Sequence, residues 1–135
     1  MELVIDANVF FSVLIKKGKT EELIFNDNLQ LYAPEFIFVE FNKFKDKILD
    51  KTERTLFDFF SLVDILKKRI KTIPNEETEK FLLEAEEICP DRKDVDYFAL
   101  ALMLNCAIWS QDKAMKEKQN RVQIYSTDEL VELLK

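Results

Sequence analysis

The sequence predicts an α/β domain in which most strands of the sheet are parallel. Short apolar runs alternate along the chain with longer segments whose apolar residues recur at helical spacing. The apolar runs contain few polar residues, as expected of strands that are covered on both faces. Apolar residues make up 47% of the chain and the single glycine leaves no flexible linker, so we expect one domain spanning residues 1–135.

The N-terminal segment predicts one strand followed by two helices. Residues 2–5, ELVI, suit a buried strand, and residues 7–15 predict a helix. Residues 16–19 contain the only glycine and predict a turn. Thr20, which is followed by two glutamates, predicts the start of a second helix.

The next segment predicts a second strand and two more helices. Residues 29–33, LQLYA, indicate a strand, and Pro34 suits the first turn of a helix that runs to about Leu49. Thr52 is expected to cap the following helix. The apolar positions of that helix fall on one face, and they are Leu56, Phe59, Phe60, Val63 and Leu66.

The remaining segments predict three strands, at residues 70–73, 106–110 and 122–126. Asn75 is expected to begin an acidic helix that ends near Ile88. A further helix carries apolar residues on one side, namely Val95, Phe98, Ala99, Leu102 and Met103. A capping box formed by Ser126 and Glu129 predicts the start of the last helix.

Composition and charge exclude several classes of function. The absence of histidine excludes histidine-based acid–base catalysis, Ser-His-Asp triads and histidine-bound zinc. Residues 76–96 carry a charge of −6 that equals the net charge of the chain, so the remainder is neutral and could carry a basic face. Cys89 and Cys106 form no CxxC pair, and no signal peptide or membrane-spanning run is recognisable. We therefore expect a cytoplasmic protein that does not enter a membrane.

Two acidic residues follow predicted strands. Asp6 comes directly after the first strand, and Asp112 comes two residues after AIWS, residues 107–110. Because the carboxyl ends of parallel strands meet at one edge of a sheet, both acids are candidates for a site there. Each also has a local interpretation, Asp6 as a helix N-cap and Asp112 as a turn residue or cap.

Glu40 borders the apolar stripe of a predicted helix. The stripe consists of Ile37, Phe41, Phe44 and Ile48, and Glu40 lies beside Phe44 at its edge. A carboxylate in this position is costly unless it is paired or bound to a cation. Spacing alone leaves equally open that Glu40 reaches solvent or a lysine at the rim.

Three aspartates crowd the segment before residues 97–104. Asp91 and Asp94 share a helical face, and Asp91 could be an N-cap with Asp94 in the first turn. Asp96 lies about 200° around the helix from Asp94, so it cannot point in the same direction.

Together these segments resemble the PIN domain, a family of metal-dependent ribonucleases, over nearly the whole chain. VIDANVF, residues 4–10, is similar to the family's opening strand with its acid, and PEFIFVEF, residues 34–41, to the segment that supplies the second acid. Residues 90–115 are similar to the most specific stretch, an aspartate before an ALA-like helix and then a strand that ends in Thr/Ser-x-Asp. The resemblance assigns four acids, Asp6, Glu40, Asp94 and Asp112.

The resemblance implies a three-layer α/β/α sandwich around a mostly parallel sheet of four or five strands. It implies that the four acids hold Mg²⁺ or Mn²⁺, directly or through water, for cleavage of RNA. It also implies a homodimer, and either the role of a toxin with an antitoxin protein as partner or a role in RNA processing.

Other residues near these acids are secondary candidates. Asn8 and Ser110 could hydrogen-bond a ligand or phosphate, although Asn8 equally suits a local bond at the helix start, and Asp91 could join the site by its face. Candidates for binding RNA are Lys16, Arg92, Lys93 and Lys113, although a solvated surface explains most of them equally well.

Three other functions are alternatives to a nuclease. A phosphatase with Asp6 as nucleophile is disfavoured because Asn8 stands where its general acid is expected. A receiver domain needs an acid pair after the first strand and a lysine after the last, and the sequence offers neither. A non-catalytic interaction module with the same fold is the third alternative, and the complete set of acids counts against it.

Overall fold

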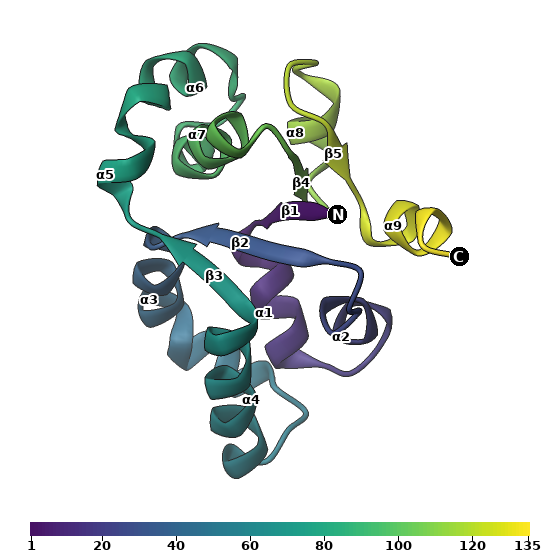
Figure 1. Ribbon diagram of the computed structural model, residues 1–135. Helices are drawn as coiled ribbons and strands as arrows, with labels where there is room; N and C mark the ends of the chain where they lie inside the picture. Colours follow the sequence, from purple (N-terminus) through teal and green to yellow (C-terminus); the bar gives the residue numbers. More distant parts are fainter.

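The computed structural model describes residues 1–135 and contains one five-stranded sheet (Figure 1). The strands lie in the order β3-β2-β1-β4-β5, and every neighbouring pair is parallel. They are β1 (Glu2–Ile5), β2 (Gln30–Pro34), β3 (Ile70–Ile73), β4 (Ala107–Trp109) and β5 (Ile124–Tyr125). In the centre of the sheet, Val4 lies between Tyr32 and Ile108. The predicted parallel α/β architecture is confirmed.

Helices cover both faces of the sheet and complete a three-layer sandwich (Figure 1). They are α1 (Ala7–Ile15), α2 (Lys19–Ile24), α3 (Phe36–Lys51), α4 (Leu56–Arg69), α5 (Asn75–Thr78), α6 (Leu82–Ile88), α7 (Val95–Leu104), α8 (Lys113–Glu117) and α9 (Thr127–Leu133). In Figure 1, α1 to α4 lie on one face, and α5 to α7 on the other. This division is the one expected of right-handed crossovers, because the chain moves outward from β1 to β3 and then returns across the sheet to β4.

A continuous core of 34 buried apolar residues joins the three layers. Leu3, Val4 and Ile5 have no exposed surface, which explains why this strand is apolar at consecutive positions. None of the helices has the length and apolar character needed to cross a bilayer.

Two predicted helix starts are wrong. Pro34 is the last residue of β2, and α3 begins at Phe36. Thr52 ends α3 instead of capping α4, because its hydroxyl donates to the Leu14 carbonyl at 2.8 Å. The N-cap of α4 is Thr55, whose hydroxyl accepts a hydrogen bond from the Asp58 backbone N–H at 3.1 Å.

Two predicted helical faces also differ from the structure. In α4, Leu56 and Phe60 are exposed, and Leu62 is buried in their place. In α7, five consecutive residues from Tyr97 to Ala101 are buried, so the helix has more than one apolar side. The reason is that α7 contacts both the sheet and the pair α5–α6.

The acidic helix expected from Asn75 to Ile88 is interrupted. A 3₁₀ turn at Glu79–Phe81 separates α5 from α6. The buried Thr78 hydroxyl donates back to the Asn75 carbonyl at 3.0 Å, a side-chain bond of the kind that bends helices.

Candidate active site

The candidate site lies at the carboxyl edge of the sheet, where the strand order reverses. From β1 the chain proceeds to β2 on one side, and from β4 it proceeds to β5 on the other. Crevices form at such switch points because the two following connections diverge to opposite faces. The Asp6 backbone N–H, which donates to the Trp109 carbonyl at 3.2 Å, joins the two strand ends.

Asp6 is a buried carboxylate with both oxygens fixed. Its Oδ1 accepts from the Val9 backbone N–H at 2.9 Å, which confirms Asp6 as the N-cap of α1. Its Oδ2 accepts from the Ser110 hydroxyl at 2.5 Å. The Asp112 backbone N–H donates to the same Ser110 oxygen at 3.0 Å, so the β4–α8 loop orients Asp6.

Glu40 and Tyr97 reach the site from opposite helical layers. The Tyr97 hydroxyl, carried by α7, donates to Glu40 Oε1 on α3 at 2.6 Å. Partial burial raises the pKa of Glu40, and the Tyr97 hydrogen bond opposes that rise. Glu40 forms no ion pair with a lysine. Its partner is Tyr97, which the sequence did not indicate. A buried tyrosine hydroxyl signals the need for a partner, but spacing cannot identify one that is 57 residues away.

Asp94 is a half-buried carboxylate to which no protein group donates a hydrogen bond. Burial raises its pKa to about 7, and the negative charges of Asp91, Asp6 and Asp112 add to the rise. Asp91 caps the 3₁₀ turn at Arg92–Asp94, where its Oδ1 accepts from the Lys93 backbone N–H at 3.1 Å. The structure therefore gives Asp91 a local bond and leaves Asp94 without one.

One small hollow brings together three of the four predicted acids. Asp6, Glu40 and Asp94 line a cavity of about 150 Å³. Its other lining residues include Asn8, Lys93 and Tyr97. The hollow therefore combines negative carboxylates from three separate elements with one lysine.

Asp112 is exposed and lies beside this hollow. Its Oδ1 accepts from the Ala114 and Met115 backbone N–H groups at 2.9 and 3.2 Å, which confirms it as a helix cap. The negative charge of Asp112 also contributes to raising the pKa of Asp6 and of Asp94.

The predicted basic residues occupy different places. Lys93 lines the acidic hollow, whereas Lys16 lines a neighbouring one between α1 and α3. Arg92 lies with Asp96 in a separate hollow against α6, and Lys113 is the exposed first residue of α8.

The donor set suits a hard divalent cation. All the acidic groups offer oxygen, and burial raises the pKa of Asp6 to about 6 against the lowering effect of its hydrogen bonds. A cation would relieve the repulsion between these carboxylates. No three acidic or cysteine side chains stand close enough together to enclose an ion. The residues therefore match a divalent cation in the kind of donor atom that they offer. They suit an ion such as Mg²⁺ that keeps several waters and uses few carboxylates.

Comparison with known families identifies the fold. The family model described as PIN domain matches residues 4–130, which include all four of these acids. No curated protein matches significantly. PIN domains are generally nucleases and typically use divalent metals. With its matched span and its parallel five-stranded sandwich, this chain belongs to the PIN domain family.

Proposed function

We propose that this protein is an endoribonuclease that uses Mg²⁺ or Mn²⁺ to hydrolyse RNA phosphodiester bonds. The observation that carries the proposal is the hollow at the sheet edge, which three carboxylates from separate elements line without any histidine. Such carboxylates are the groups that hold these ions in phosphate chemistry.

Each residue has a distinct part in this proposal. A bound divalent ion supplies Lewis acidity and neutralises the charge of the phosphate. Asp6 and Glu40, held by Ser110 and Tyr97, provide oxygens at fixed positions. Asp94 and Asp112 complete the set, and Glu40 or Asp94 orients the attacking water.

Lys93 and Asn8 line the same hollow and can contact the substrate. The Lys93 ammonium lies 3.6 Å from Asp91 Oδ2 in an exposed ion pair, and its positive charge lowers the pKa of both Glu40 and Asp94. A phosphate that approaches the acids meets this charge, so Lys93 can offset their repulsion.

Removing the Tyr97 hydroxyl tests how Glu40 is positioned. In Tyr97→Phe we expect the affinity for Mn²⁺ to fall about tenfold, as for other groups that orient a metal ligand. Because the hydrogen bond opposes the rise in the pKa of Glu40, its loss should also move Mn²⁺ binding to higher pH. Calorimetric titration at several pH values measures both effects. Unchanged affinity and an unchanged pH profile would show that Tyr97 only fills space.

We also propose that this protein has a protein partner in the cell. A homodimer, or an antitoxin protein in a toxin–antitoxin pair, is supported by apolar side chains that α4 exposes. These are Leu56, Phe57, Phe60 and Ile65, of which Phe57 is 81% exposed. A toxin and an RNA-processing enzyme would both act on RNA in the cytoplasm.

A second candidate function is that of a non-catalytic interaction module. The observation in its favour is that the acids, as placed, do not enclose an ion. An Asp6-nucleophile phosphatase has less support, because both oxygens of Asp6 already accept hydrogen bonds and its side chain is buried.

A cleavage assay on structured and single-stranded RNAs separates these functions. We expect the purified protein to cleave RNA internally with Mn²⁺ or Mg²⁺ and to lose that activity in EDTA. Asp94→Asn serves as the inactive control, and Asp64→Asn, an exposed acid on α4, as the matched surface control. Equal cleavage by Asp94→Asn would reveal a contaminating nuclease. Absence of both cleavage and Mn²⁺ binding in the wild-type protein would favour the interaction module.

A further inference from the structure

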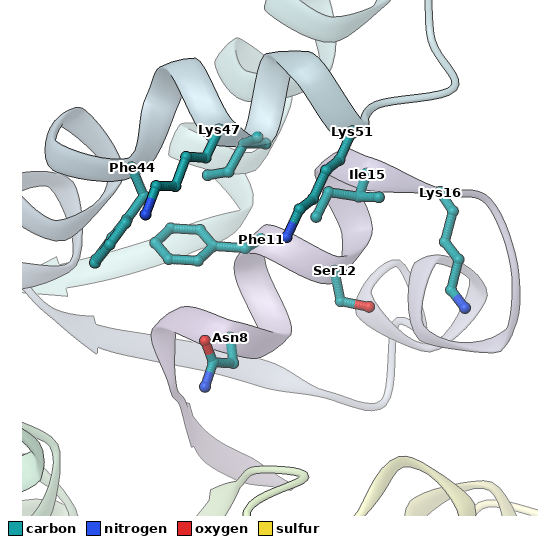
Figure 2. A pocket seen from close by; sticks show the side chains of 9 residues that line it. Asn8, Phe11, Ser12, Ile15, Lys16, Phe44, Lys47 and Lys51 are labelled. Carbon is teal, nitrogen blue, oxygen red and sulfur yellow. The ribbon is translucent and has the colours of Figure 1, made fainter.

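A second hollow adjoins the acidic one. It lies between α1 and α3, has a volume of about 460 Å³ and is here called the lysine groove (Figure 2). α1 contributes Phe11 and Ile15, with Lys16 directly after its end, and α3 contributes Phe44, Lys47 and Lys51. The volume is within the range of sites that bind a small molecule or part of a larger ligand.

The charge of the lysine groove selects an anionic occupant. Lys16, Lys47 and Lys51 line it, and no acidic residue does. None of the three forms an ion pair, although six ion pairs occur elsewhere in the protein. In a chain of net charge −6, this local excess of positive charge suits a polyanion.

The lysine groove is continuous with the acidic hollow. Asn8, Phe11 and Phe44 line both of them. Along α1, the distance from Asn8 to Lys16 is about 12 Å at the usual helical rise. A chain bound at the acids can therefore continue along the groove to the lysines.

The shared wall of the two hollows is aromatic. The ring centroids of Phe11 and Phe44 lie 6.0 Å apart at an interplanar angle of 62°. Both rings are only partly buried, and the Lys47 ammonium lies 5.8 Å from the Phe44 centroid. The groove thus offers an apolar surface for a planar base with a positive charge next to it.

We propose that the lysine groove binds the nucleotides that flank the cleaved phosphodiester of single-stranded RNA. Lys16, Lys47 and Lys51 contact the phosphates, and Phe11 and Phe44 pack against a base. An unpaired strand is required, because the bases of a duplex are stacked on one another and cannot reach the rings. This inference rests on the proposed function for its choice of RNA as the substrate.

A binding measurement tests the lysines independently of cleavage. Lys47→Gln/Lys51→Gln is placed in the inactive Asp94→Asn protein, and a labelled ten-nucleotide unstructured RNA is titrated in EDTA by fluorescence anisotropy. We expect Kd to rise about tenfold and the slope of log K against log salt to become shallower by about 1.4, for two lost phosphate contacts. The matched control is Lys68→Gln/Lys71→Gln, which removes two exposed lysines from α4 and β3 and should leave Kd unchanged.

A second variant tests the base contact. Phe44→Leu should weaken binding of the RNA about fivefold or more, and it should leave binding of an abasic strand of equal length unchanged. Thermal unfolding of each variant checks that it is folded.

Three results would overturn the inference. The first is an equal loss of RNA affinity in the groove lysine variant and in the control lysine variant. The second is an equal loss of affinity for RNA and for the abasic strand in Phe44→Leu. The third is displacement of the RNA from the groove by a ten-residue polyglutamate peptide at equal concentration. If the wild-type protein cleaves no RNA but the groove variants still weaken RNA binding, the proposed nuclease activity is contradicted and RNA binding by the groove is supported. If the protein cleaves RNA but the groove variants bind RNA as tightly as their parent, only the proposal that the groove binds RNA is contradicted.

Discussion

Asp94→Asn is expected to remove most of the RNA cleavage and, at the same time, to make the metal-free protein more stable. Loss of one oxygen from a metal site costs several kcal/mol of transition-state stabilisation, so we expect activity to fall roughly a thousandfold. The Asp94 side chain accepts no hydrogen bond from the protein, so replacing its carboxylate by the amide of asparagine breaks no hydrogen bond. The substitution therefore removes a charge without removing a structural contact.

The stability gain follows from the electrostatics of the hollow. Burial and neighbouring carboxylates raise the pKa of Asp94 from 3.8 to about 7. Between these pH values the folded chain holds more protons than the unfolded one, so stability falls as the pH rises from about 4 to about 7. Because Asp94 is half exposed, solvent screens its charge, and we expect Asp94→Asn to gain about 1–2 kcal/mol at pH 8.

Thermal unfolding in EDTA at pH 5 and pH 8 measures this gain. At pH 8 the melting temperature of Asp94→Asn should exceed that of the wild type by roughly 4–8 °C, and the difference should shrink at pH 5. Added Mn²⁺ should stabilise the wild type and have little effect on the variant. Asp64→Asn should match the wild type throughout. A variant that Mn²⁺ stabilises as much as the wild type, or that is less stable than the wild type at pH 8, would show that Asp94 is not part of an ion site.

Arg69→Ala is expected to destabilise the fold by about 3 kcal/mol, the largest effect we expect from a residue outside the site. The Arg69 guanidinium, at the end of α4, donates from Nε to the Ile24 carbonyl at 2.9 Å. Its Nη2 donates to the Asn26 and Leu29 carbonyls at 2.6 and 2.8 Å. Together these bonds satisfy the end of α2 and the loop that leads into β2.

Urea unfolding compares Arg69→Ala with two matched variants. Arg69→Lys should recover only part of the loss, because an ammonium on a flexible chain cannot reproduce the planar fork. Lys68→Ala, at the exposed neighbouring position, should stay within about 0.5 kcal/mol of the wild type. The m-value should not change if the variants unfold in one step. If Arg69→Ala lost less than about 1 kcal/mol, its three hydrogen bonds would be no better than those to water.

Segments whose structure depends on local pattern were predicted closely. Residues 2–5, 7–15 and 70–73 are the observed β1, α1 and β3, and the capping box of Ser126 and Glu129 is present. These features depend on residues within one or two turns, so the sequence contains what determines them. The predicted start of α4 was wrong because local sequence does not decide it. Thr52 and Thr55 are equally good caps, and only the contact of Thr52 with α1 distinguishes them.

The four candidate acids were identified from the sequence, and their surroundings were not. Asp6 and Asp112 were singled out because they follow strands, and Glu40 because it borders an apolar stripe. The PIN resemblance then assigned these three together with Asp94. The Tyr97 partner of Glu40 and the raised pKa of Asp94 depend on two helical layers meeting across the sheet edge. The lysine groove depends in the same way on α1 and α3 lying side by side.

The sequence by itself determined the order of the five strands and of most helices along the chain, because periodicity is a local property. It also singled out four candidate acids, through strand ends, an apolar stripe and the resemblance to the PIN domain. Only the tertiary structure decided which acids share one hollow, which side chains hold them and where the unpaired lysines gather. These outcomes depend on contacts such as Ser110 to Asp6, between groups 104 residues apart. Burial and proximity then set the pKa values, and neither can be read from spacing along the chain.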